Sequence, residues 1–117
     1  MHLDDHLSDA GVVVDVRATT PGDLDAATIL RDRLRVLAAK GYNVILLNVA
    51  DVAYIDSVLL GAIVQAYVAT IRSGGTLKLL NASKRVRDLL RVTKLDRLIE
   101  TAEPGAEGAS RASGDAL

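Results

Sequence analysis

Short and long apolar segments alternate along the chain. Three short segments are rich in Val, Ile and Leu, which is typical of β-strands: 12–17, 44–49 and 76–81. Three longer segments carry apolar residues at helical spacing: 26–40, 57–72 and 84–92. This order predicts an α/β fold, with a mixed, mostly parallel β-sheet of about four to five strands and helices packed against it.

The predicted helices begin and end at residues that commonly cap helices. Asp25 is placed to accept an unpaired backbone N–H at the start of the first helix, and Gly41 to end it. Asp56 and Ser57 open the second helix, and Ser83 opens the third. The second helix is apolar nearly all round, so we expect it to be either deeply buried or in contact with a partner.

A single domain is expected over residues 12–102. Residues 1–11 are polar and read as a flexible N-terminal arm or a weak edge strand, and residues 103–117 as a disordered, glycine-rich tail. Residues 95–101 have room for a short helical turn and a last short strand. The continuous apolar run at 44–49 predicts a strand that is covered on both faces.

Composition excludes several classes of protein. The 117-residue chain has no cysteine, so it has no disulfide, thiolate metal site or cysteine nucleophile. Its net charge of −1 gives no general attraction to nucleic acid or to anionic lipid. The apolar stretch 58–71 is too short to span a membrane, and the N-terminal segment lacks a signal-peptide pattern. We therefore expect a cytoplasmic protein with no nucleic-acid or membrane partner.

The sequence lacks the residue combinations that are typical of enzyme active sites. The two histidines, His2 and His6, lie in the N-terminal arm, so the usual pairing of a nucleophile with a histidine base is unavailable. No glycine-rich phosphate loop is present. The basic segment 84–97 has no interleaved aromatic residues and is interpreted as a solvated helix face. We expect no enzyme activity, no metal and no cofactor.

Ser57 is the residue whose position suggests a function. A phosphoryl group on Ser57 would lie at a helix N-terminus, where unpaired N–H groups and the helix dipole favour negative charge. It would also place nearly two negative charges beside Asp56, Val58 and Leu59, where a bound partner would have to desolvate them. The position can thus act as a charge switch. The alternative is that Asp56 or Ser57 serves only as a helix cap.

Several segments resemble the STAS domain, the fold of bacterial anti-sigma factor antagonists. Gly22-Asp23-Leu24-Asp25 looks like the Gly-Glu-Leu-Asp of the family, and residues 51–61 (DVAYIDSVLLG) are similar to the loop and helix start that contain Asp-Ser-Ser-Gly-Leu-Gly. Residues 74–86 resemble the strand and helix that follow, and Thr93-Lys94-Leu95-Asp96 looks like the motif before the last strand. Together these pieces extend from residue 22 to about residue 98.

The resemblance implies partner switching without catalysis. In that family the serine after the aspartate, here Ser57, is phosphorylated by a serine kinase of the histidine-kinase-like ATPase type that is also the anti-sigma factor. The unphosphorylated form binds that partner and frees the sigma factor, and a phosphatase resets the cycle. The residues expected to contact the partner are Asp23, Asp25, Asp56, Ser57, Val58, Leu59 and Ala62.

Two positions depart from the family pattern. Val58 replaces the usual Ser or Thr, and Leu59 replaces the usual Gly, which places more bulk where a kinase must approach. The alternative function is therefore a STAS scaffold or a subunit of a transport complex. In that case the apolar residues around Val58, Leu59 and Ala62 form a constitutive interface, and Ser57 is not phosphorylated.

Overall fold

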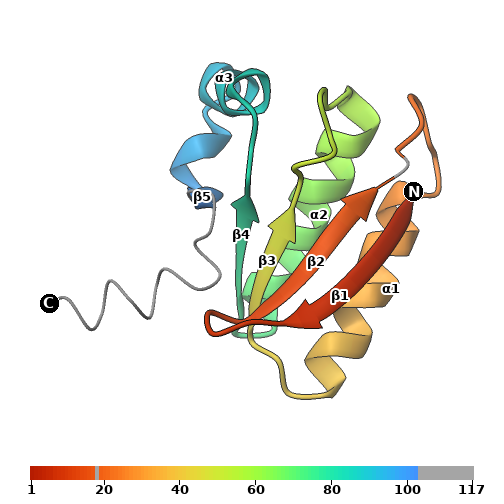
Figure 1. Ribbon diagram of the computed structural model, residues 1–117, viewed down its shortest axis with the longest axis vertical. Coiled ribbons are helices and arrows are strands. Elements are labelled where there is room, and N and C mark those ends of the chain that lie inside the picture. Colours follow the sequence, from red (N-terminus) through yellow and green to blue (C-terminus); the bar gives the residue numbers. More distant parts are fainter. Residues whose placement is uncertain (18, 103–117) are drawn as a thin grey trace, which may run out of the picture.

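Five strands form one β-sheet in the order β1-β2-β3-β4-β5 (Figure 1). Their bounds are β1 His2–Leu7, β2 Val12–Arg17, β3 Val44–Asn48, β4 Thr76–Leu80 and β5 Glu100–Ala102. β1 pairs antiparallel with β2, and every other neighbouring pair is parallel. The computed structural model describes residues 1–17 and 19–102. It confirms the predicted mixed, mostly parallel sheet, whereas the predicted disordered tail, 103–117, lies outside the described residues.

Two helices cover one face of the sheet (Figure 1). They are α1 Ala26–Ala39 and α2 Ser57–Arg72, and they also pack against each other. A third helix, α3 Lys84–Val92, follows β4, and the 3₁₀ turn η1 Leu95–Arg97 leads into β5. The predicted boundaries of α2 and α3 are confirmed, and the Ser83 hydroxyl accepts the Val86 backbone N–H at 3.1 Å, as expected for a cap.

The main core lies between the sheet and the helices. Alternate residues of the central strands point into it, because successive side chains of a strand face opposite sides. These residues are Val12, Val14 and Val16 of β2, Ile45 and Leu47 of β3, and Leu77 and Leu79 of β4. The leucines of the predicted α1 stripe are buried in the same core: Leu30, Leu34 and Leu37.

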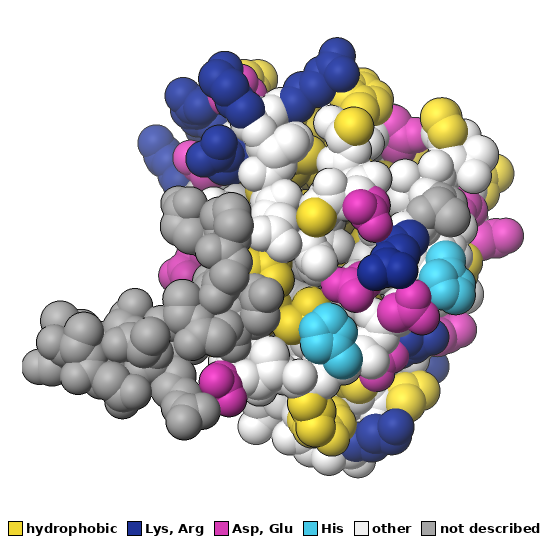
Figure 2. Space-filling model, in the orientation of Figure 1, with side chains coloured by type: hydrophobic (Ala, Val, Ile, Leu, Met, Phe, Trp, Pro, Cys, Tyr) yellow, Lys and Arg dark blue, Asp and Glu magenta, His cyan; other side chains and the backbone are white. Residues whose placement is uncertain are grey.

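In the part of the chain that the structure describes, no helix lies over the opposite face of the sheet. Val13, Leu46 and Leu80 form a small buried cluster there, with Ala10 and Ala102 packed against it. Charged side chains gather over the strands on this face (Figure 2). The prediction that β3 is buried on both faces is thus correct, because Leu46 is buried on this side. The cover here comes from neighbouring side chains and not from helices.

The N-terminal residues form an edge strand, which is one of the two alternatives drawn from the sequence. β1 pairs with β2 from His2↔Arg17 to Leu7↔Val12. Leu3 is buried in the main core, and Arg33 of α1 contacts both the Leu3 carbonyl oxygen (3.3 Å) and the Asp5 carboxylate. These contacts hold β1 against the rest of the fold.

The prediction that the Asp25 side chain caps α1 is wrong. Asp25 occupies the position before the helix, but its side chain makes no capping hydrogen bond. Instead the Asp23 carboxylate accepts the Asp25 backbone N–H at 2.9 Å, which stabilises the turn that leads into the helix. At the other end, Gly41 has φ +89°, as expected for a glycine that ends a helix.

Candidate functional site

Ser57 is the first residue of α2, and its side chain is exposed. The residue that caps the helix is Asp56, whose Oδ1 accepts the Leu59 backbone N–H at 2.8 Å. Among the described residues the Ser57 hydroxyl has no hydrogen-bond partner. Asp56 therefore caps the helix, and the Ser57 hydroxyl is left open to solvent.

The Asp56 carboxylate also joins two segments that are far apart in the sequence. Its Oδ2 accepts the Gly22 backbone N–H at 2.7 Å. Gly22 has φ +73° and lies in a turn closed by a hydrogen bond from the Asp23 N–H to the Thr20 carbonyl oxygen (3.1 Å). A positive φ is costly for most other residues, so glycine is suited to this position. The loop of the first motif is thereby placed against the start of α2.

Hydrogen bonds keep Asp56 ionised. The backbone N–H of Leu59, and then that of Gly22, lowers the pKa of Asp56 below its ordinary value because both donors favour the charged carboxylate. The pKa of Asp23 is also lowered, chiefly by the ammonium group of Met1, which lies 3.0 Å from its carboxylate. Asp56 therefore places a negative charge beside Ser57, whereas the charge of Asp23 is paired with the Met1 ammonium group.

Little empty space lies beneath these loops. The cavity between the Gly22 loop and the start of α2 measures about 10 Å³. That volume is close to the minimum for one water molecule. A metabolite does not fit in this cavity.

Two residues expected to contact a partner are instead buried. Leu59 is 7% exposed and Ala62 is 2% exposed, and both belong to the main core. Their positions in the first turns of α2 face the sheet, whereas Ser57 faces solvent and Val58 is half-buried. The expectation that Leu59 adds bulk on the side where a kinase approaches is therefore wrong, and only Val58 changes the exposed part of the motif.

Two exposed apolar residues near this site were missed in the sequence. Leu24 is 83% exposed and Tyr54 is 61% exposed. They lie in the two loops that the Gly22–Asp56 hydrogen bond joins, and the Arg85 guanidinium lies over the Tyr54 ring at 5.4 Å. A signal was present in the sequence, since both residues are apolar but lie outside every helical or strand pattern. We call Leu24, Tyr54, Ser57 and Val58 the Ser57 surface.

A ladder of polar side chains, which sequence reasoning also missed, anchors the loop that leads to Ser57. The Asn48 amide donates to Asp15 Oδ1 at 2.8 Å, and its oxygen accepts from the Asn81 amide at 3.0 Å and from the Ala50 backbone N–H at 3.1 Å. Asn48 and Asn81 end or follow the adjacent strands β3 and β4. We call Asp15, Asn48 and Asn81 the strand-end ladder.

The other residues considered as candidate sites do not form a cluster in the described ranges. Residues 1–17 and 19–102 contain no group of three potential metal-binding side chains. His6 and His2 instead lie near single carboxylates, those of Asp15 at 3.8 Å and Asp4 at 3.2 Å. The basic residues of α3 gather at one end of the molecule (Figure 2). Within the same ranges, no helix has both the length and the apolar character that crossing a membrane requires.

Comparison with known proteins identifies the family. The STAS domain model matches residues 9–107, which is most of the chain. The anti-sigma-B factor antagonist of Bacillus subtilis is 34% identical over 88 residues, covering 74% of this chain and 80% of that protein. The TM1081 homolog of Thermotoga neapolitana is 37% identical over 75 residues, covering 64% of this chain and 66% of that protein.

A solved structure supports the same assignment. The crystal structure of TM1081 from Thermotoga maritima has a TM-score of 0.71 and 28% identity to this chain. The match covers 90% of this chain and 89% of that one. Similarity in sequence and in fold thus extends across the sheet, the helices and the Ser57 loop, and the chain belongs to the STAS domain family.

Proposed function

We propose that this chain is an anti-sigma factor antagonist, a non-enzymatic module that binds its partner when Ser57 is unmodified and releases it when Ser57 is phosphorylated. The partner in this proposal is an anti-sigma factor that is also a serine kinase of the histidine-kinase-like ATPase type. The observation that carries the proposal is the exposed Ser57 hydroxyl at the first residue of α2. The identity to the B. subtilis antagonist supports the regulatory role.

The chemistry at Ser57 is a phosphoryl transfer. The Ser57 Oγ forms a bond to the γ-phosphorus of ATP held by the kinase, ADP leaves, and the hydroxyl proton passes to a base of the kinase. The product lies at the N-terminus of α2, where unpaired backbone N–H groups favour an anion. The exposure of Ser57 at the first residue of α2 supports the proposal that a phosphoryl group is added there without a rearrangement of the backbone.

Charge explains why the modification releases the partner. Phosphorylation adds about −1.5 to −2 charges at neutral pH. The new charge lies next to the ionised Asp56 and beside the exposed apolar side chains of Leu24 and Tyr54. A partner that covers the Ser57 surface must remove water from this charge, which is costly when no opposite charge is supplied.

The burial of Leu59 bears on whether a kinase can reach the site. Because this side chain packs in the core, the Leu that replaces the family Gly does not cover the hydroxyl. Val58 is half-buried and is the remaining change at the surface. We propose that Ser57 is accessible to the kinase and that a phosphatase returns the chain to its binding form.

Phosphorylation and binding can be tested together. The purified chain is incubated with ATP and each histidine-kinase-like ATPase of the source organism, and the adduct is located by mass spectrometry. We expect a single gain of about 80 Da on Ser57, absent from Ser57→Ala. Ser57→Asp should weaken binding by about tenfold or more, because it fixes a charge in a desolvated contact.

A matched variant separates the switch from general electrostatics. Gln65→Glu adds the same charge to an exposed position farther along α2 and should leave binding unchanged. No adduct with any of these kinases, together with binding that is indifferent to Ser57→Asp, would rule the proposal out. A complex of fixed stoichiometry that resists ATP and phosphatase would instead support a scaffold or a subunit of a transport complex.

A further inference from the structure

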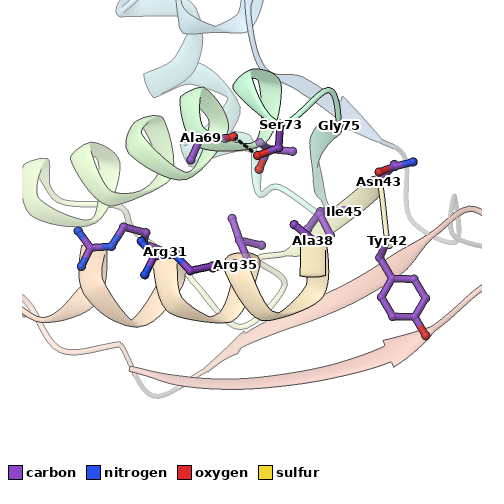
Figure 3. Close-up of a pocket in the computed structure, with 11 residues that line it drawn as sticks. Arg31, Arg35, Ala38, Tyr42, Asn43, Ile45, Ala69, Ser73 and Gly75 are labelled. Carbon is purple, nitrogen blue, oxygen red and sulfur yellow. Dashed lines mark hydrogen bonds between the residues drawn. The ribbon is translucent and has the colours of Figure 1, made fainter. Parts of the chain in front are cut away.

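A groove separates α1 from α2 at the end of α2 that is opposite Ser57 (Figure 3). Its volume is about 300 Å³. That size lies at the lower end of the range of ligand-binding pockets, about 300–1,000 Å³. The helical rise places the groove, at Ala69 and Ser73, about 20 Å along the axis from Ser57. It is therefore a separate feature from the Ser57 surface.

The walls of the groove are mainly apolar. The apolar lining residues are Leu34 and Ala38 of α1, Ile45 of β3 and Ala69 of α2. Two of them are alanines on the facing helices, and their short side chains leave the space that longer side chains would fill. Figure 3 shows Ala38 on α1 and Ala69 on α2, with Ile45 of β3 beside them.

One end of the groove is strongly basic. Arg31 and Arg35 lie one turn apart on α1, and both are exposed lining residues. Of the residues at 1–17 and 19–102, none that lines the groove is acidic. Arg31 has an ion pair at 3.8 Å with the exposed Asp32, and Arg35 has no ion pair within the described ranges. Like charges one turn apart on a helix repel each other, so a bound anion would relieve this repulsion.

The Thr70 and Ser73 hydroxyl groups on the α2 side of the groove do not offer protons to an anion. Ser73 Oγ donates to the Ala69 carbonyl oxygen at 3.1 Å, and Thr70 Oγ1 donates to the Ala66 carbonyl oxygen at 2.8 Å. Both protons are thus used within α2. The charged groups of the lining are therefore the two arginines, with the polar side chains of Tyr42 and Asn43 beside the apolar residues that suit an alkyl chain.

We propose that this groove binds a small amphipathic monoanion, specifically a medium-chain carboxylate. The carboxylate lies between Arg31 and Arg35, where each guanidinium donates charge-assisted hydrogen bonds. The alkyl chain lies against Leu34, Ala38 and Ala69. The volume of about 300 Å³ limits the ligand to a short acyl chain.

Octanoate is a suitable probe, and octanol and octylammonium are matched comparators with the same chain length. Binding to the full chain is measured by calorimetry and by amide chemical shifts. We expect octanoate to saturate the protein with shifts at Ala38 and Ala69, and octylammonium to bind about tenfold more weakly or not at all. Phosphatidylglycerol vesicles distinguish a free carboxylate from a lipid surface, and we expect no co-sedimentation with them.

Variants locate the charge recognition. The double variant Arg31→Gln with Arg35→Gln should weaken octanoate binding by about tenfold and leave octanol binding unchanged. The control is Arg87→Gln with Arg91→Gln, which removes two arginines with the same spacing from the exposed face of α3. Ala69→Leu fills the groove from an exposed position and should weaken binding of both probes.

Several results would overturn the proposal. Among these are equal affinity for octanoate and octylammonium, an equal loss in the α3 control, amide shifts away from the groove, or no octanoate binding at millimolar concentration. Vesicle binding that depends on Arg31 and Arg35 would replace the free carboxylate with a lipid. Thermal unfolding of each variant identifies any that fails to fold. We expect these variants to leave phosphorylation of Ser57 unchanged, since they lie at the other end of the helices, so the two proposals can fail independently.

Discussion

Removing the Asn48 amide tests the strand-end ladder directly. Asn48→Ala deletes one donor and one acceptor at the point where β3 ends and the loop toward Ser57 begins. Asp15 loses its 2.8 Å hydrogen bond, the Asn81 amide loses its 3.0 Å acceptor, and the Ala50 N–H loses its 3.1 Å acceptor. The variant should therefore destabilise the fold well beyond the effect of an average surface substitution.

The size of the loss follows from the exposure of each partner. Ala50 is exposed, so water replaces its lost acceptor at little cost. Asn81 is half-buried, and the side chain of Asp15 is only 13% exposed, so both are left with poorly solvated polar groups. A buried polar group without its partner costs about 1–3 kcal/mol, and a hydrogen bond contributes about 1 kcal/mol. We expect the free energy of unfolding to fall by about 2–3 kcal/mol.

The chain supplies a matched control at the other end of the same strand. Asn43 is exposed, and its side chain makes no hydrogen bond to a described residue. Asn43→Ala should change stability by less than about 0.5 kcal/mol. Urea unfolding followed by circular dichroism gives both values. A loss of 2–3 kcal/mol corresponds to a fall in Tm of roughly 10–20 °C for a domain of this size.

An equal effect of the two substitutions would refute the assignment of the ladder. Asn48→Asp adds a second check, because it keeps the acceptor but places a carboxylate against Asp15. This variant should be less stable than Asn48→Ala at neutral pH and should recover as the pH falls and one carboxylate is protonated. No recovery would show that the two side chains do not face each other.

Three further predictions test the description of α2 and its surroundings. Gly61→Ala adds a methyl group that meets no atom within 4 Å and should stabilise the helix by about 0.5–1 kcal/mol. Gly75→Ala places its methyl group 2.7 Å from a backbone oxygen and should destabilise the fold. Thermal unfolding distinguishes the two variants. Leu59→Ala should lower the free energy of unfolding by about 2–5 kcal/mol because the side chain is in the core. Leu24→Ala should lower it by less than about 0.5 kcal/mol because the side chain is exposed. Equal values in urea unfolding would contradict the assigned burial. The pKa of Asp56 is lowered by its two backbone donors, so its contribution to stability is full above the unfolded-state pKa and is lost as the pH falls through the folded-state pKa. Between about pH 5 and pH 2, Asp56→Asn should lose less stability than the unsubstituted chain in urea unfolding, and parallel losses would show that these donors do not act on the carboxylate.

Periodicity was sufficient to predict most of the fold. The strand at 12–17 and the helix at 57–72 have the bounds that their apolar patterns indicate, and the strand predicted at 44–49 ends one residue earlier, at Asn48. These features depend on residues that are close in the sequence, so local spacing determines them. The short strand after η1 was also expected, although its register with β4 was not.

Contacts between distant segments could not be predicted in the same way. The hydrogen bond from Gly22 to Asp56 spans 34 positions, and the ladder from Asp15 to Asn48 spans 33. Both depend on strand register and on loop conformation, which no single segment specifies. The failure of Asp25 to cap α1 has the same origin, because the loop that docks on Asp56 also sets the direction of the chain before the helix.

The sequence did not reveal which side chains of the candidate site point to solvent. Ser57 and Asp56 were correctly placed at the start of a helix, since their spacing from the helical stripe is enough for that. Leu59 and Ala62 were assigned to the exposed side, although three- and four-residue spacing places them with the buried Ile63 and Ala66. An almost wholly apolar helix conceals this distinction, because it lacks the polar face that would mark the solvent side.

The edge strand β1 has a consequence for self-association. The outer edge of a sheet presents unpaired N–H and carbonyl groups to which another chain can add, and this is a route to aggregation. A net charge of only −1 provides little general repulsion between molecules. In β1, however, five of the six side chains are exposed, and His2, Asp4, Asp5 and His6 are among them. A second copy of the chain that adds its β1 strand here would place its carboxylates against those of the first, and the two sets repel each other. The polar side chains of β1 therefore protect this edge against fibril growth.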